Sequence, residues 1–417
     1  MTVGRSTVLG AAVAALLGSL AVWIVSAVSP LMRDELGLTE QRLGLAVSVY
    51  FAVSALVSWL GGGLSDRIGA RTTLLIGAAT SVGAVVGIVA VAGTWIHLVL
   101  LLALAGVGSA IIQPATNHAI VRGVRLGRHG LALGLKQASV PAATTLAGVG
   151  VPLLAVTFGW RWAFALPVAA GLVFLGLQGA LPDGRRPSAR LADADRAGDG
   201  GGARSLAVLA VAGGVGVGAI SAATAFLVPY LVWQGSSEGT AGWVLALASL
   251  AGVAMRVLNG WRADSLGTSS VPTIVALLAA GAVGGAGVAV APSTPWIAVG
   301  AVLMVGAGWG WNGLLVLTIV RAFPDTPGLA TGISQVGIRG GGALGPGAFG
   351  LLVAVSGYAA AWLAVAVALG AAAVLMFLGG RLLPDPAAGG VADPDAAASS
   401  SSGPAPPHLE TGTSTNG

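Results

Sequence analysis

The sequence predicts an all-α membrane protein with twelve transmembrane helices in two parallel six-helix repeats, and three observations lead to this prediction. The composition is strongly apolar, since 55% of the 417 residues are hydrophobic and only 8% are charged, against about 25% charged in a typical soluble domain. Apolar runs long enough to cross a bilayer recur along the whole chain. The second half of the chain also repeats motifs of the first. The composition alone excludes a water-soluble fold of this size.

Twelve apolar runs are long enough to span, because one crossing takes about 20 residues. They lie at roughly 9–31, 43–64, 73–93, 96–121, 131–157, 162–181, 205–233, 241–262, 271–291, 296–321, 329–355 and 359–383. Twelve crossings use about 240 residues, which leaves room for short loops and a tail but not for a second globular domain. The first run is longer than the usual 7–15 apolar residues of a signal peptide, so we expect it to be a retained helix.

These runs divide the chain into four parts. Residues 1–181 form an N-terminal six-helix bundle, and residues 205–383 form a C-terminal one. Between them lies a central loop, residues 182–204, which mixes charges with Gly and Pro. The tail, residues 384–417, is rich in Ala, Ser, Pro and Gly and has too little apolar surface to fold. We expect both the loop and the tail to be flexible and cytoplasmic.

Cationic residues predict the orientation, because cytoplasmic loops carry an excess of Lys and Arg. With the N-terminus inside, only Arg33, Arg42 and Arg161 fall outside. The inside arginines are Arg5, Arg67, Arg71, Arg122, Arg125, Arg128, Arg185, Arg186, Arg190, Arg196, Arg204, Arg262, Arg321 and Arg381. We therefore expect a multi-pass protein of the cell membrane, monomeric in the bilayer, with both termini cytoplasmic. The net charge of +5 follows from this topology, so no nucleic-acid partner is expected.

An internal repeat relates the two halves of the chain. A shift of 198 residues aligns Gly62, Asp66 and Gly69 with Gly260, Asp264 and Gly267. The same shift aligns a longer set of residues: Leu131, Ala132, Gly134, Gln137, Leu146, Leu153, Leu154 and Gly159 with Leu329, Ala330, Gly332, Gln335, Leu344, Leu351, Leu352 and Gly357. Each half contains an even number of spans, so the repeats are parallel, about an axis along the membrane normal. This arrangement is typical of transporters that rock around a central site.

The segment between the second and third spans reads GGLSDRIGARTTL from residue 62. It resembles the G-x-L-x-D-R-x-G-R-[RK] signature of the major facilitator superfamily, with Gly62, Leu64, Asp66, Arg67, Gly69 and Arg71 in register and Ala70 where the family usually has a basic residue. A degenerate copy, with Gly260, Asp264 and Gly267, lies between spans 8 and 9. The resemblance covers about residues 5–383 and implies a secondary transporter that works by alternating access.

We interpret these motif residues as a gate on the inner side. A carboxylate at the end of the second span can accept hydrogen bonds from a helix N-terminus and from an Arg of the opposite half, and Gly62 permits close helix approach. Such contacts exist only when the inner side is closed. The alternative interpretation is that Asp66 and Arg67 are a polar turn that ends the second span.

Three cations lie within the predicted spans, and no Asp or Glu lies well inside any of them. Arg339 falls near the middle of span 11, whereas Lys136 and Arg256 lie nearer the inner face. An unpaired charge inside a membrane is costly, and such residues usually line a cavity on a substrate path. The natural partner is an anionic substrate. For Lys136 and Arg256 the alternative is that they snorkel to the inner surface or bond to carbonyls at helix ends. Cations on spans 8 and 11 are also similar to the pattern of organic-anion carriers of the superfamily.

Polar and aromatic residues complete the predicted substrate site. Gln137 and Gln335 match across the repeat, as expected for residues that face a shared axis, and Gln113, Trp311 and Asn312 lie on spans 4 and 10. Each of them alone could instead be a hydrogen bond between packed helices.

The function that we predict from the sequence is secondary active transport of a small organic anion, by symport or antiport. A coupling proton on Asp34 or Glu35, exchange of anions and facilitated diffusion stay open. The chain has no cysteine, no Walker A loop, no dinucleotide fingerprint and no metal-ligand cluster, so we expect no cofactor, no metal and no enzymatic activity. The alternative function is proton-driven efflux of hydrophobic drugs or a natural product. A third possibility is a membrane sensor that keeps the fold without moving a solute.

Overall fold

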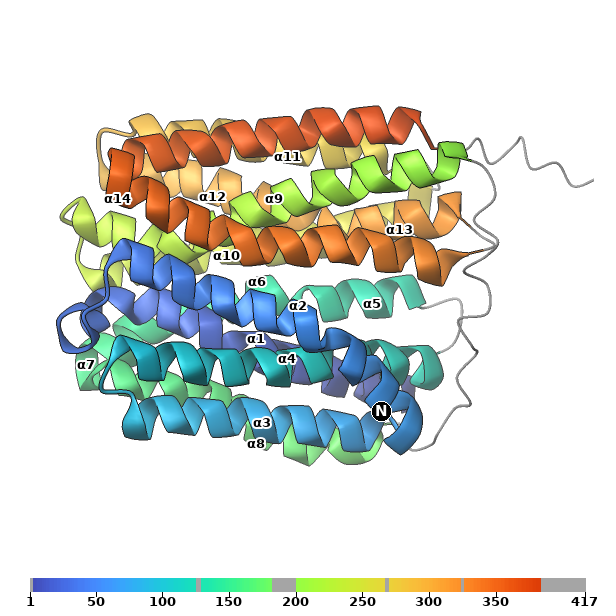
Figure 1. Cartoon of the computed structure of the whole chain (residues 1–417), viewed down its shortest axis with the longest axis horizontal. Coiled ribbons are helices and arrows are strands. Elements are labelled where there is room, and N and C mark those ends of the chain that lie inside the picture. Colours follow the sequence, from blue (N-terminus) through green and yellow to red (C-terminus); the bar gives the residue numbers. More distant parts are fainter. Residues whose placement is uncertain (1–2, 125–128, 182–199, 267–269, 324–325, 384–417) are drawn as a thin grey trace, which may run out of the picture. The chain divides into compact units, whose positions relative to one another are not determined.

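The computed structural model describes residues 3–124, 129–181, 200–266, 270–323 and 326–383, which belong to one compact unit that ends at Leu383. Figure 1 shows helices that run alongside one another, with α1 to α8 gathered on one side and α9 to α14 on the other. The predicted tail lies outside the described residues. So does the predicted central loop up to residue 199, whereas residues 200–204 are helical and begin α9 instead of ending a loop.

The N-terminal half, residues 3–181, supplies the first six predicted spans. They are α1 (Val3–Leu36), α2 (Glu40–Ile68), α3 (Ala70–Val91), α4 (Trp95–Gly123), then α5 (His129–Gln137), α6 (Ser139–Gly150), η2 (Val151–Ala155) and α7 (Val156–Phe158) as the fifth, and η3 (Trp160–Phe164), α8 (Ala165–Leu177) and η4 (Gln178–Ala180) as the sixth. Threonines start two of the helices, because Thr39 and Thr94 accept hydrogen bonds from the backbone N–H groups of Arg42 and His97.

The C-terminal half, residues 200–383, supplies the other six. They are α9 (Gly200–Trp233), α10 (Glu238–Leu266), α11 (Val271–Val290), α12 (Thr294–Gly310) with α13 (Asn312–Ala322), and α14 (Pro327–Arg381). Eleven helices of the described chain are long and apolar enough to cross a membrane, and the last of them covers 53 residues. A helix of that length measures about 80 Å, more than twice the hydrocarbon core. The two predicted spans 329–355 and 359–383 are therefore joined in α14, which breaks at Gly357, where the backbone is not helical.

Glycines with positive φ make the tight turns at equivalent places of the two halves. Gly159 and Gly357, which the predicted repeat pairs, have φ of 99° and 80°. Gly37 and Gly235, which are also 198 residues apart, have φ of 62° and 90°. Side chains rarely adopt these angles, whereas glycine does so at no steric cost. The structure thus gives a physical reason for the glycine pair Gly159 and Gly357 of the repeat.

Helices α9 and α14 approach so closely that their backbones touch. A methyl group added at Gly337, Gly341 or Gly345 of α14 would collide with the backbone carbonyl of Ala210, Gly214 or Gly218 of α9, respectively. The three glycines of α14 are four residues apart, and so are the three small residues of α9. Each set therefore forms one stripe along its helix. In membranes, small residues in this spacing allow close van der Waals packing of helices. This packing fixes the position of α14, which carries Arg339.

Candidate functional site

Lys136, at the end of α5, lies inside the protein with an exposed fraction of 4%. Its ammonium donates a hydrogen bond to Oε1 of Gln113 on α4, with 2.6 Å between Nζ and Oε1. The amide is neutral and supplies no counter-ion. The structure therefore places the Lys136 side chain in the interior and does not support snorkelling to the inner surface.

Arg256 on α10 joins the two halves through backbone carbonyls at the ends of α5 and α12, which is one of the two alternatives that the sequence left open for it. Its Nη1 donates to the carbonyl oxygen of Gln137, and its Nε donates to the carbonyl oxygen of Trp309 at 2.5 Å. In an unbroken helix the Gln137 carbonyl would accept from residue 141, but residue 141 is Pro141, which has no N–H. The free carbonyl is thus a product of the sequence of the fifth span, and an arginine from the other half uses it.

Gln137 and Asn312 make a second contact between the halves. The Gln137 side chain donates from Nε2 to Oδ1 of Asn312 at 3.4 Å. Asn312 begins α13, directly after the break at Trp311 that separates α12 from α13. Both breaks, at Ala138 and at Trp311, thus lie next to the contacts of Arg256.

Arg339 lies on α14, and no hydrogen bond or ion pair is found for it among the described residues. Both Arg256 and Arg339 are within electrostatic range of the Lys136 ammonium, and Arg339 is also within range of the Tyr50 hydroxyl. None of the three cations forms an ion pair with an Asp or Glu of the described chain. The structure therefore brings together three basic side chains, Lys136, Arg256 and Arg339, which we call the cation cluster.

Aromatic rings lie against the cation cluster. The guanidinium carbon of Arg256 is 5.5 Å from the ring centre of Trp309. Trp309 in turn meets the edge of Trp23 on α1 at a centroid distance of 6.1 Å, and Trp23 meets Phe51 of α2 at 5.8 Å. Sequence reasoning did not include Trp23 in the site. The available signal was its place in the middle of an apolar span, since tryptophans of membrane proteins usually lie at the span ends.

The other predicted site residues are placed as follows. Gln335 is half-buried on α14, about one helical turn before Arg339. Trp311 is fully buried and packs inside the C-terminal half, where a methyl group added at Gly216 of α9 would lie 2.9 Å from its ring. The contact shown for the Trp311 side chain is thus with α9, whereas its neighbour Asn312 reaches Gln137.

Contacts between the two halves are dense on the predicted outer side. A methyl group added at Gly148 of α6 would lie 2.6 Å from the backbone nitrogen of Ala246 on α10. A methyl group added at Gly44 of α2 would collide with the backbone carbonyl of Pro346 on α14. On the predicted inner side, a methyl group added at Gly62 would find no heavy atom within 4 Å. The backbones of the two halves thus meet on the predicted outer side.

The motif residues of the predicted inner gate lie at the end of α2. The carboxylate of Asp66 is 3.7 Å from Nδ1 of His118, a residue of the same half. Gly69, with φ of 87°, ends α2 and starts α3, and Arg71 donates from Nε to Oε1 of Gln178 at 2.6 Å. The close helix approach expected at Gly62 is made instead by Gly61, where a methyl group would lie 2.6 Å from the Ala110 carbonyl oxygen.

The remaining motif residues are only partly described. Arg67 is exposed in the last turn of α2. Gly260 lies in α10, and a methyl group added there would find no heavy atom within 4 Å. Asp264 belongs to the same helix, but its side chain lies outside the described part, as does Gly267.

Comparison with known proteins agrees with the fold. The profile of the family described as Major Facilitator Superfamily matches residues 11–326. Similar proteins include a hexuronate transporter of Bacillus subtilis, 27% identical over 150 residues, or 36% of this chain and 35% of that protein. A probable sulfoacetate transporter of Cupriavidus necator is 28% identical over 152 residues, 36% of this chain and 34% of that protein. The alignments thus span about a third of these two relatives.

A longer match is found to monocarboxylate transporter 11 of Mus musculus, which is 30% identical over 370 residues, 85% of this chain and 74% of that protein. Among solved structures, that of a D-xylose–proton symporter superposes with a TM-score of 0.74 at 17% identity, covering 92% of this chain and 98% of that one. At this identity the superposition supports the shared fold and not a shared substrate.

Proposed function

The chain belongs to the major facilitator superfamily and is a multi-span membrane transporter, not an enzyme, and we propose that its substrate is a small organic anion. The observation that carries the proposal is the cation cluster: the buried Lys136 and Arg256 and the half-buried Arg339, with no carboxylate paired to them among the described residues. Uncompensated charge inside a membrane protein marks a substrate path. A small anion would supply the missing negative charge.

Each member of the cluster has a distinct role in this proposal. Arg339 has no partner among the described residues and offers the free donors of its guanidinium to the anion. Arg256 is held by the carbonyls of Gln137 and Trp309, and it fixes the charge at the junction of the halves. Lys136, held by Gln113, adds a third positive charge.

Gln137, Asn312 and Gln335 are proposed to line the substrate site together with the cation cluster. Because they belong to different halves, their contacts should change during transport. Asn312 belongs to the C-terminal half and Gln137 to the N-terminal half, so the link between them changes when the halves rock. Asp66, Arg67, Arg71 and the motif glycines are proposed to close the inner side in the alternate state, in which the outer side is open. The substrate would thus meet water on one side at a time.

The names of the relatives support an anionic substrate. Hexuronate, sulfoacetate and monocarboxylates are all organic anions. The alternative, efflux of hydrophobic drugs, is favoured by one observation only, the aromatic rings of Trp23, Phe51 and Trp309 next to the cluster. A drug exporter would tolerate neutral or cationic substrates and would not depend on Arg339.

A thermal-shift screen of the purified protein tests the proposal. The ligands are small carboxylates, a sulfonate, inorganic phosphate, inorganic anions and cationic drugs, applied to the parent protein and to the Arg339→Gln variant. A ligand that binds only the folded state raises the melting temperature. At a ligand concentration one hundred times Kd, the free energy of unfolding rises by about 2.7 kcal/mol. We expect at least one organic anion to stabilise the parent and to lose most of this effect in the variant.

Arg381→Gln is the matched control, because Arg381 lies on the same helix but at its exposed end. It removes the same charge from α14 without touching the cation cluster, so the response to the anion should persist. If only hydrophobic drugs stabilise the protein, and do so equally in Arg339→Gln, the anion proposal is wrong and the exporter takes its place.

A further inference from the structure

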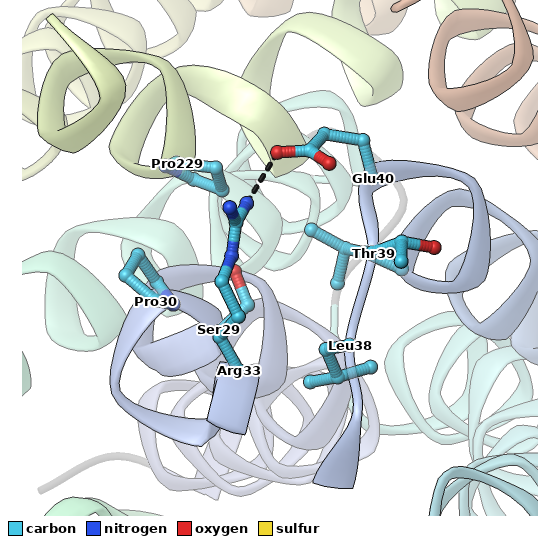
Figure 2. A pocket seen from close by; sticks show the side chains of 8 residues that line it. Ser29, Pro30, Arg33, Leu38, Thr39, Glu40 and Pro229 are labelled. Carbon is cyan, nitrogen blue, oxygen red and sulfur yellow. Dashed lines mark hydrogen bonds and ion pairs between the residues drawn. The ribbon is translucent and has the colours of Figure 1, made fainter. Parts of the chain in front are cut away.

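The carboxylate of Glu40, at the predicted outer end of α2, has partners in both halves of the protein. Arg33 of α1 forms an ion pair with Oε1 of Glu40, and the hydroxyl of Tyr358 on α14 donates to the same oxygen at 3.3 Å. Figure 2 shows Arg33 and Glu40 joined across a small pocket, with Pro229 of α9 beside the guanidinium. The C-terminal half therefore contributes both a wall of this pocket and a hydrogen bond to the carboxylate.

The Tyr358 bond depends on direct contact between α2 and α14. Ser48 Oγ accepts a hydrogen bond from the backbone N–H of Gly347 at 2.9 Å. A methyl group added at Gly350 would lie 2.5 Å from the backbone carbonyl oxygen of Glu40. Because the backbones meet here, the Tyr358 hydroxyl loses Glu40 as soon as the outer ends of the two helices separate. Tyr358 itself is 4% exposed and packs against Tyr230 at a centroid distance of 5.2 Å.

Glu35 offers an internal comparison, because it is a second carboxylate at the outer side that is paired with an arginine. It accepts hydrogen bonds from Trp160 Nε1 at 2.8 Å and from Arg161 Nη2 at 2.5 Å. Both partners belong to the N-terminal half, as Glu35 does. The protonation of Glu35 therefore changes no contact between the halves, whereas the protonation of Glu40 does.

We propose that Glu40, Arg33 and Tyr358 form an outer latch that an external proton releases. This proposal rests on the alternating access described above. While Glu40 is ionised, its negative charge strengthens the bond from Tyr358 and holds the outer side closed. A proton on Glu40 neutralises the acceptor, weakens that bond, and favours the state that is open to the outside.

The direction of the pH dependence follows from linkage. The outer-closed state gives the ionised carboxylate a donor that the outer-open state lacks. The bond from Tyr358 therefore favours the closed state while Glu40 is ionised, and a proton on Glu40 removes that preference, so acidification should favour the open state. Among the described residues, the charged and titratable groups that contact the Glu40 carboxylate are Arg33 from α1 and Tyr358 from the C-terminal half. Tyr230 packs against Tyr358, and Arg42, two residues further along α2, donates to the Gly37 carbonyl.

Distances between spin labels test the latch, and the absence of cysteine from the sequence allows labels to be attached at chosen positions. Gly93→Cys, between α3 and α4, and Ser293→Cys, between α11 and α12, place one label on the outer side of each half at exposed positions. The full chain in nanodiscs, without any added anion, is measured by double electron–electron resonance over a range of pH. We expect the longer distance to gain population as the pH falls.

Glu40→Gln and Tyr358→Phe are the test variants, and Glu35→Gln is the matched control. We expect Glu40→Gln to increase the ratio of open to closed populations by about tenfold at neutral pH and to remove most of its pH response. Tyr358→Phe keeps the ring and removes only the hydroxyl, so it gives a similar shift without a change of charge and carries the test if Glu40→Gln folds poorly. Glu35→Gln should match the labelled parent.

The proposal is overturned if Glu40→Gln and Tyr358→Phe show the parent's distances and pH response, or if Glu35→Gln shifts the distances as much as Glu40→Gln does. The anion screen is a separate readout. A failure of the latch leaves the Arg339-dependent stabilisation by an anion unchanged, and a failure of the anion proposal leaves the label distances unchanged.

Discussion

Replacing Gly341 by alanine tests the close contact between α9 and α14 that positions Arg339. A methyl group at Gly341 would collide with the carbonyl oxygen of Gly214, a backbone atom that cannot rotate away. The neighbouring Gly340 is the matched control, because a methyl group there would have no heavy atom within 4 Å. Both substitutions are glycine to alanine in the same turn of the same helix, so only the packing differs.

The expected magnitude follows from two opposing terms. Alanine in place of glycine inside a helix contributes about 1 kcal/mol through helix propensity, and this gain is the same at both positions. Overpacking at Gly341 costs about 1–3 kcal/mol, and this cost is absent at Gly340. We therefore expect Gly340→Ala to be neutral or stabilising and Gly341→Ala to melt roughly 2–6 °C below it.

The assay is thermal unfolding of both variants and the parent protein in the same detergent. An increase of the melting temperature by Gly341→Ala as large as that by Gly340→Ala would refute the reasoning, because it would mean that α9 and α14 are not in backbone contact. In that case the placement of Arg339 relative to α9 would also lose its support.

Two further predictions concern the cation cluster and the motif turn. Asn312→Asp keeps the acceptor for Gln137 but adds a negative charge next to the cation cluster. The anion found in the screen should therefore bind at least about tenfold more weakly, measured as its Kd. An unchanged Kd would argue against binding at the cation cluster. Gly69→Ala places a side chain at a φ of 87° and should lower the free energy of unfolding by about 1–3 kcal/mol. Gly62→Ala is the control, because a methyl group there has open space around it and should cause no such loss. Equal losses of stability in thermal unfolding would contradict the positive φ as the cause.

The sequence was sufficient for the architecture, because the bilayer imposes simple rules on it. Each crossing needs about 20 apolar residues, so spans can be read from composition. Turns between helices that need positive φ require glycine, which is why the repeat was visible at Gly159 and Gly357. The structure differs from the predicted spans mainly at helix ends. The last two spans are joined in α14, and α9 starts within the predicted loop.

The identity of the buried cations was also predictable, since a charge inside an apolar span is conspicuous. The particular carbonyls and aromatic rings that these cations contact could not be predicted from the sequence. The run GWGWNGL places Trp309 and Trp311 two residues apart, and at about 100° per residue they point to nearly opposite sides of the helix. Only the packing decides that Trp309 meets Arg256 and that Trp311 faces Gly216.

The sequence by itself thus determined the helices, their repeat and the presence of three interior charges, because these follow from local chain properties and from the cost of charge in a membrane. The tertiary structure alone decided which groups meet. Arg256 binds a carbonyl that lies 119 residues away in the chain, and Glu40 binds Tyr358 from 318 residues away. Such pairs depend on the rotation and tilt of packed helices, and a linear pattern of residues does not contain these quantities.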